Sequence, residues 1–266
     1  MSESRSLLLI NPQITSRRSA RFPLSLLSLA GYLEEGRSCR VIDGNVDRDY
    51  LSTLRRVLST ERFEAVGVTV MGGPQVRSAI DVSTTVRDAA PTVPIVWGGY
   101  FPTLYPETAL NAPYVDYAIR GPGEAAFAEL LDVIHGDDPQ ALASIAGLTW
   151  KQAGRIVRNP DRGFEDRRTP ALLPYDLLGN PSGYLAKTFL GRRTAAHQAS
   201  VGCRFRCTFC GVAAMFRGAT GLPPAVRLER DLRWLKEHMG ADSIQFFDHN
   251  FFDREADMIP LLEVLA

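Results

Sequence analysis

The sequence has no apolar run long enough to cross a membrane and no net charge. It also has few cysteines, and their spacing does not suggest pairing in disulfides. A membrane-spanning helix needs about 20 apolar residues, whereas the first segment, MSESRSLLLINP, has only four in a row, too few for a signal peptide. Lys+Arg and Asp+Glu number 30 each, which argues against electrostatic capture of nucleic acid or of an anionic membrane. We therefore expect a cytoplasmic protein that binds neither.

The four cysteines are few and unevenly placed. Cys39 stands alone, whereas Cys203, Cys207 and Cys210 lie close together. Crowded thiols in a reducing compartment do not form a disulfide framework, which leaves metal or redox chemistry. The rest of the composition is ordinary for a globular protein: 266 residues, 45% hydrophobic and 23% charged. That is enough chain for one large domain or two smaller ones.

Short apolar runs alternate with amphipathic segments over residues 1–138. The expected strands are residues 6–11, 39–43, 65–71, 95–100 and 115–119, and the expected helices are residues 24–35, 50–58, 75–89 and 124–135. The third strand is almost wholly apolar, as a parallel strand buried on both faces requires. Such alternation predicts βαβ units. We expect an α/β fold with a doubly wound, five-stranded parallel sheet of Rossmann-like type.

Residues 139–188 are expected to form a hairpin and a linker. GLTWKQAGRIVRN (147–159) has a hairpin pattern with Gln-Ala-Gly at its turn. Residues 160–181 carry four prolines and weak periodicity, which favours a linker on the surface. Residues 189–266 then show a second βα pattern, with strands at 194–202 and 243–247 and helices at 226–239 and 255–266.

The strongest chemical signal is CRFRCTFC, in which Cys203, Cys207 and Cys210 form a CxxxCxxC motif. Three thiolates at this spacing can ligate three irons of a [4Fe–4S] cluster and leave the fourth iron open, because no fourth cysteine is nearby. A structural zinc site normally has four protein ligands. His197 or Cys39 could complete such a site, so zinc and unreactive buried thiols remain as alternatives.

At these residues the sequence resembles the radical S-adenosylmethionine (SAM) enzymes, whose motif has an aromatic residue before the last cysteine, here Phe209. The resemblance implies a [4Fe–4S] cluster, SAM at its open iron, and reductive cleavage of SAM to a 5′-deoxyadenosyl radical. It implies SAM contacts at Phe209 and at Asp248, where His249 replaces the second of two adjacent acids. It also implies a small-molecule substrate and an electron donor such as a flavodoxin or ferredoxin. Five arginines and no acid between residues 191 and 226 would favour an anionic cluster.

The N-terminal part resembles the cobalamin-binding subfamily of these enzymes. The matching pieces are Asn11-Pro12, Val66-Gly67-Val68-Thr69, WGGYFPT (97–103), RGPGE (120–124) and the hairpin. Ligands of open α/β sheets lie at the carboxyl ends of the strands, and glycines there let the backbone approach a flat corrin ring. The residues expected to contact cobalamin are Thr69, Gly72, Gly73, Gly98, Gly99, Tyr100, Gly121 and Glu124. No Asp-x-His-x-x-Gly motif occurs, so we expect no protein histidine on cobalt.

The resemblance also bears on chain length, because the family's partial barrel has more βα units than the two that residues 189–266 can hold. We expect the N-terminal portion of a longer enzyme, from a truncated reading frame, a deliberately shortened chain or a split protein completed by a separate chain. The expected reaction is methyl transfer to an unactivated carbon, with methylcobalamin delivering the group. The alternatives are ring formation like that of the anaerobic magnesium-protoporphyrin ester cyclase, a non-catalytic cobalamin and iron–sulfur binding module, and an unrelated doubly wound domain with a zinc loop.

Overall fold

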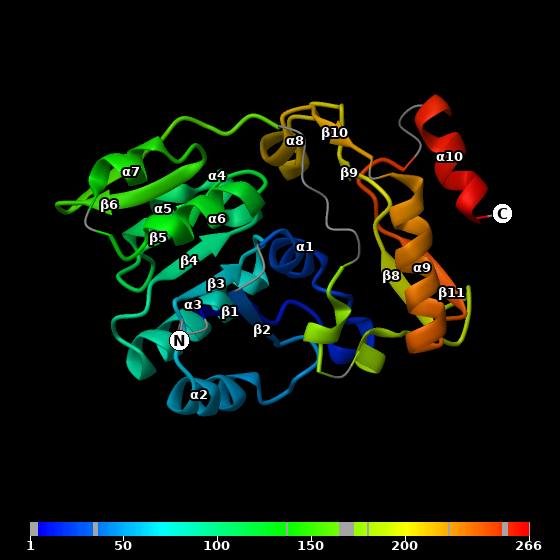
Figure 1. Ribbon diagram of the computed structural model, residues 1–266, viewed down its shortest axis with the longest axis horizontal. Helices are drawn as coiled ribbons and strands as arrows, with labels where there is room; N and C mark the ends of the chain where they lie inside the picture. The colour runs from blue at the N-terminus through cyan, green and yellow to red at the C-terminus, as the bar shows by residue number, and fades with distance from the viewer. Residues whose placement is uncertain are drawn as a thin grey trace.

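A seven-stranded sheet is the largest unit of the computed structural model, which describes residues 5–33, 37–136, 138–164, 173–179, 181–222, 224–251 and 255–265 (Figure 1). Its strand order is β2-β1-β3-β4-β5-β6-β7. The strands are β1 (Arg5–Asn11), β2 (Arg37–Asp43), β3 (Ala65–Thr69), β4 (Ile95–Gly98), β5 (Tyr117–Ile119), β6 (Leu148–Gln152) and β7 (Arg155–Arg158). The first five pair in parallel, which confirms the predicted α/β fold. The hairpin β6–β7 extends the same sheet through antiparallel pairing with β5.

Helices cover both faces of this sheet. The central residues of β1 are all apolar, because their side chains pack alternately against the helices on one face and on the other. Leu8 and Ile10 pack in one cluster with α2 (Tyr50–Thr60) and α3 (Pro74–Ala89). Leu7 and Leu9 pack in another with α1 (Leu24–Tyr32) and α6 (Glu124–Val133). These four side chains in the middle of β1 are fully buried. A parallel strand between two helical layers needs apolar residues at every position.

Several boundaries differ from those expected. β4 ends at Gly98, and Gly99, with φ of +97°, turns the chain into α4 (Tyr100–Leu104), so Tyr100 begins a helix instead of ending a strand. The expected strand 194–202 is split into β8 (Thr194–His197) and β9 (Val201–Gly202). The periodicity did not predict α5 (Pro106–Asn111) or α7 (Pro139–Ser144). The hairpin turn was predicted correctly: Ala153 and Gly154 have φ of 48° and 78°, as a two-residue hairpin loop requires.

The C-terminal elements lie beside the large sheet (Figure 1). β8 pairs in parallel with β11 (Ser243–Phe246), and β9 pairs antiparallel with β10 (Thr220–Gly221). The helices here are α8 (Gly211–Phe216), α9 (Ala225–Met239) and α10 (Glu255–Leu265). Across the described stretches of the chain, no helix has both the length and the apolar character needed to cross a membrane.

Tyr175 and Tyr184, which lie in the chain before β8, are packed inside the protein. Tyr175 and Tyr184 are 1% and 3% exposed, and they lie in two short 3-10 helices, η2 (Tyr175–Leu177) and η3 (Pro181–Tyr184). Tyr184 stacks on Phe22 and Tyr175 on Trp234, with ring centroids 4.9 Å and 4.7 Å apart. The prediction of a surface linker is therefore wrong for this stretch, because its aromatic rings bridge the region before α1 and α9. Residues 165–172 of the expected linker lie outside the described residues.

Candidate functional site

A cavity of about 600 Å³ lies at the carboxyl ends of β3, β4 and β5. Five of the eight residues expected to contact cobalamin line it: Thr69, Gly98, Gly99, Gly121 and Glu124. Gly72, Gly73 and Tyr100 do not line it. The first two are exposed at the start of α3, and Tyr100 turns toward the C-terminal elements. Parallel strands end at one edge of a sheet, and this is why loops far apart in the sequence share the cavity.

The sheet side of the cavity is a glycine-rich surface. A Cβ added to Gly98 would meet no protein atom within 4 Å, so the backbone there faces open space. Gly99 has φ of +97°, and a Cβ on it would lie 3.0 Å from the carbonyl oxygen of Val70. Beside them, Ser28 of α1 donates a hydrogen bond of 2.9 Å to Glu124 Oε1, which ties α1 to the start of α6. Because the backbone at Gly98 faces open space, a flat ligand can approach the main chain there directly.

The opposite side of the cavity is built by the chain on either side of the three cysteines. Ser200 and Val201 precede them, and Met215 and Phe216 of α8 follow them. Phe216 packs edge-on against Phe164, with ring centroids 6.2 Å apart. One cavity therefore joins the strand ends of the large sheet to the segments that hold the cysteine loop.

The cysteine loop runs from β9 to α8 and carries three free thiols. Cys207 is exposed, and Cys203 and Cys210 are half-buried. Phe209 between them is 91% exposed. Within the described residues, no three His, Cys, Asp or Glu side chains are placed to hold a single metal ion. A [4Fe–4S] cluster takes its thiolates on separate irons, so three free thiols in one loop are a suitable donor set for it.

Tyr100 and His249 meet between the large sheet and the C-terminal elements, a contact that the sequence analysis missed. The Tyr100 hydroxyl lies 2.9 Å from Nε2 of His249. Burial, with a contribution from nearby Cys210, raises the pKa of Tyr100 to about 12. Burial also lowers the pKa of His249. Both shifts favour the neutral side chains in this contact. The two residues are 149 positions apart, and no local pattern signals the pair.

Asp248 lies at the end of β11, where its carboxylate accepts three hydrogen bonds. The donors are the backbone N–H of Ala199, at 3.1 Å, and the backbone N–H and hydroxyl of Ser200, both at 2.5 Å. These bonds tie β11 to the segment between β8 and β9. A SAM contact at Asp248 or at Phe209 stays a prediction. At Asp248 the ligand would share a carboxylate that already has protein partners, although a carboxylate has about four acceptor sites.

The arginines around the cysteines are used in different ways. Arg193 donates to the carbonyl oxygen of Gly240 at 2.9 Å, which satisfies the end of α9. Arg217 pairs with Asp161, and the guanidinium of Arg204 lies 5.0 Å from the ring centre of Phe205. At least two of the five are therefore bound to protein groups away from the thiols.

Known proteins resemble both parts of the chain. The model of the B12 binding domain family matches residues 14–131. An uncharacterized methyltransferase of Pyrococcus horikoshii is 28% identical over 231 residues, which are 86% of this chain and 49% of that protein. The cobalamin-dependent radical SAM methyltransferase TokK of Streptomyces tokunonensis is 28% identical over 182 residues, 66% of this chain and 26% of TokK. An anaerobic magnesium-protoporphyrin IX monomethyl ester cyclase of Rubrivivax gelatinosus is 27% identical over 200 residues, 71% of this chain and 34% of the cyclase.

The solved structure of the radical SAM methyltransferase TsrM from Kitasatospora setae has the same fold, with a TM-score of 0.76 at 24% identity. The match covers 98% of this chain and 50% of TsrM. The chain thus spans about half the length of TsrM and of the Pyrococcus horikoshii relative. Three observations agree with the resemblance to cobalamin-binding radical SAM enzymes that the sequence indicated. They are the match to the B12 binding domain, the CxxxCxxC loop whose flanks line the cavity, and the relatives named above. Residues 14–131 thus match the B12 binding domain family, and about two thirds of the chain is similar in sequence to a cobalamin-dependent radical SAM methyltransferase.

Proposed function

We propose that this chain is part of a cobalamin-dependent radical SAM enzyme that transfers a methyl group to an unactivated carbon of a small molecule. The observation that carries the proposal is the shared cavity: the glycine edge of the sheet forms one side, and the flanks of the cysteine loop form the other. Cobalamin in this cavity would lie next to a cluster held by the cysteine loop. A reaction that uses both cofactors requires them to lie close together.

The cavity residues fit cobalamin. Gly98 offers main chain that faces open space, because a Cβ added there would meet no atom within 4 Å, and Thr69 and Glu124 add polar groups to the cavity lining. Gly72, Gly73 and Tyr100 lie outside the cavity lining, so we give them no direct contact. None of the described residues that line the cavity is a histidine, which supports our proposal that no protein histidine coordinates cobalt.

The cysteine loop fits a cluster. We assign Cys203, Cys207 and Cys210 as its ligands, with Phe209 and Asp248 beside SAM. When bound, the reduced cluster supplies the electron that cleaves SAM, and cobalamin supplies the methyl group. The loop residues hold the cluster at the edge of the cavity, and the buried side chains of Met215 and Phe216 keep water from that side. A flavodoxin or ferredoxin is the proposed electron donor.

The relatives favour methyl transfer over ring formation, because the Pyrococcus horikoshii protein and TokK are both named methyltransferases. The similarity to the Rubrivivax gelatinosus cyclase keeps cyclisation as the second candidate. The two reactions differ in product: one adds a single carbon to the substrate, and the other closes a ring without adding a methyl group.

Anaerobic iron–sulfur reconstitution tests the cluster. We expect about four irons per chain, the content of a cubane. Alanine at Cys203, Cys207 or Cys210 should abolish the cluster. Cys39→Ala is the matched control and should leave the iron content unchanged, because Cys39 lies in β2 of the large sheet. Fewer than about three irons in the wild-type chain would contradict the cluster assignment.

Cobalamin retention on gel filtration tests the cavity. Gly98→Val should weaken retention, because its side chain projects into the open space of the cavity. Gly163→Ala is the control, since a Cβ there also meets no atom within 4 Å but lies outside the cavity lining. Equal retention of cobalamin by both variants would argue against this cavity as the cobalamin site. A histidine-ligated cobalt spectrum from the loaded protein would contradict the proposal that no protein histidine coordinates cobalt.

A further inference from the structure

We propose that Asp161 is a positioning residue that fixes α8, the helix directly after the cysteine loop, to the cobalamin edge of the sheet. The inference rests on the proposed function, because it concerns the separation of the two cofactor sites. Asp161 follows the hairpin and belongs to none of the sequence motifs, and its role depends on two arginines from distant parts of the chain.

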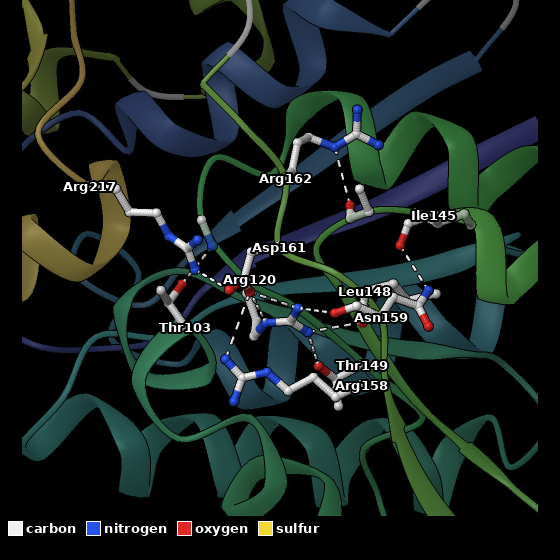
Figure 2. Close-up of polar contacts among 12 residues, drawn as sticks. Thr103, Arg120, Ile145, Leu148, Thr149, Arg158, Asn159, Asp161, Arg162 and Arg217 are labelled. Carbon is white, nitrogen blue, oxygen red and sulfur yellow. Dashed lines mark hydrogen bonds and ion pairs between the residues drawn. The ribbon is translucent and has the colours of Figure 1, made fainter.

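The two carboxylate oxygens of Asp161 have different partners (Figure 2). Oδ1 accepts hydrogen bonds from Nε and Nη2 of Arg120, at 3.0 Å and 2.8 Å. Oδ2 pairs with Nη2 of Arg217. Arg120 directly follows β5, and Arg217 is the C-cap of α8. One side chain therefore bridges the sheet and the helix.

The Arg120 side of this bridge is fixed. The side chain of Arg120 is only 3% exposed. Besides Asp161, it donates to the carbonyl oxygens of Leu148 at 2.9 Å and Asn159 at 2.6 Å, and to the hydroxyl of Thr149. These partners belong to the hairpin and its exit (Figure 2). Arg120 would keep these acceptors if Asp161 were changed, so the large sheet should remain folded.

The Arg217 side of the bridge is less constrained. Arg217 has φ of +54°, and its backbone N–H donates to the Ala213 carbonyl at 2.9 Å to close α8. Its side chain is 57% exposed. The other end of α8 abuts Tyr100: a Cβ added to Gly211 would lie 3.2 Å from that ring. Tyr100 thus meets the start of the helix, and Asp161 holds its end.

The position of α8 matters for both cofactor sites. Cys210 is the residue before the helix, and Met215 and Phe216 in the helix line the cavity. A shift of α8 would move a cluster ligand and a cavity wall together. Removing the Asp161 charge should therefore alter the geometry between the two sites without removing a residue from either.

Hydrogen–deuterium exchange on the cofactor-free chain tests the bridge. We expect the amides of residues 211–219 to exchange about two- to fivefold faster in Asp161→Asn, because a partly exposed ion pair makes a modest contribution to local stability. Arg217→Gln should give the same increase, and the double variant no further increase, since both changes break the same contact to α8, the one between Asp161 and Arg217. Arg158→Gln is the matched control: Arg158 lies 3.7 Å from Asp161 but contacts it from β7, not from α8. Unchanged exchange in both single variants overturns the proposal.

A second measurement uses the loaded protein. Microwave power saturation of the cob(II)alamin electron paramagnetic resonance signal, with the cluster reduced, reports the separation of the two paramagnetic centres. We expect the half-saturation power to change in Asp161→Asn and in Arg217→Gln at unchanged iron and cobalamin content. An identical value in wild type and both variants also overturns the proposal. The wild-type chain could bind neither cofactor while its amides at residues 211–219 still exchange more slowly than those of the two variants. In that case the proposed function fails and the Asp161 bridge stands.

Discussion

Replacing Gly202 by alanine tests how the short β9–β10 pair holds the cysteine loop. Gly202 directly precedes Cys203, has φ of +81° and pairs with Thr220. A Cβ added there would lie 2.2 Å from the carbonyl oxygen of Ala219. This is far inside the roughly 3.3–3.6 Å at which carbon and oxygen make close contact. The two strands must separate to admit the methyl group.

Two costs contribute to the destabilisation by Gly202→Ala. A left-handed backbone costs a residue with a Cβ roughly 1–2 kcal/mol. Forcing a methyl group into a packed site costs typically 1–3 kcal/mol. The sum is about 2–5 kcal/mol, and because 1.4 kcal/mol corresponds to a factor of ten, the β9–β10 pair should open at least on the order of 25-fold more often. The loop would then lose its fixed entry point.

Anaerobic iron loading and hydrogen–deuterium exchange of residues 198–222 measure this effect. We expect Gly202→Ala to take up less than about half of the four irons of a cubane and to lose protection at β9 and β10. Gly163→Ala is the control, because a Cβ there meets no atom within 4 Å, and it should behave as wild type. Wild-type iron content together with wild-type protection in Gly202→Ala would refute the reasoning.

Two further predictions concern the large sheet and its thiol. In the folded, cofactor-free chain at pH 8, iodoacetamide should label the exposed Cys207 and spare Cys39, because burial raises the pKa of Cys39 to about 11 and only the thiolate reacts. Labelling of Cys39 should rise only as the pH approaches that value, and fast labelling at pH 8 in mass spectra would contradict the burial. Ser83→Ala leaves the buried indole N–H of Trp97 without its 2.9 Å acceptor, so urea unfolding should show a loss of about 1–3 kcal/mol. The control is Ser59→Ala, because Ser59 is exposed. Equal urea-unfolding midpoints for the two variants would show that the Trp97–Ser83 hydrogen bond adds nothing to the stability of the fold.

Local pattern was enough to predict much of the fold. The apolar run of β3 and the alternation of strands with amphipathic helices gave the parallel sheet, because a strand buried on both faces needs apolar residues throughout. The hairpin turn was readable from Gly154, which has φ of +78°. The errors arose where local pattern does not decide the outcome. Tyr100 continues an apolar run but begins α4, since Gly99 turns the chain at φ of +97°. Tyr175 lies in a proline-rich segment, yet it is buried against Trp234.

The sequence by itself determined which chemical groups are present and how they are spaced: three thiols in a CxxxCxxC motif and glycines after successive strands are properties of neighbouring residues. The tertiary structure alone decided which of these residues share a cavity, so that Gly98 and Gly99 line it and Gly72 and Gly73 do not. It also decided that Tyr100 meets His249 and that Asp161 joins Arg120 to Arg217. The reason is physical. Spacing along the chain fixes local backbone geometry and donor type, whereas contacts between distant segments depend on how the sheet, its hairpin and α8 pack.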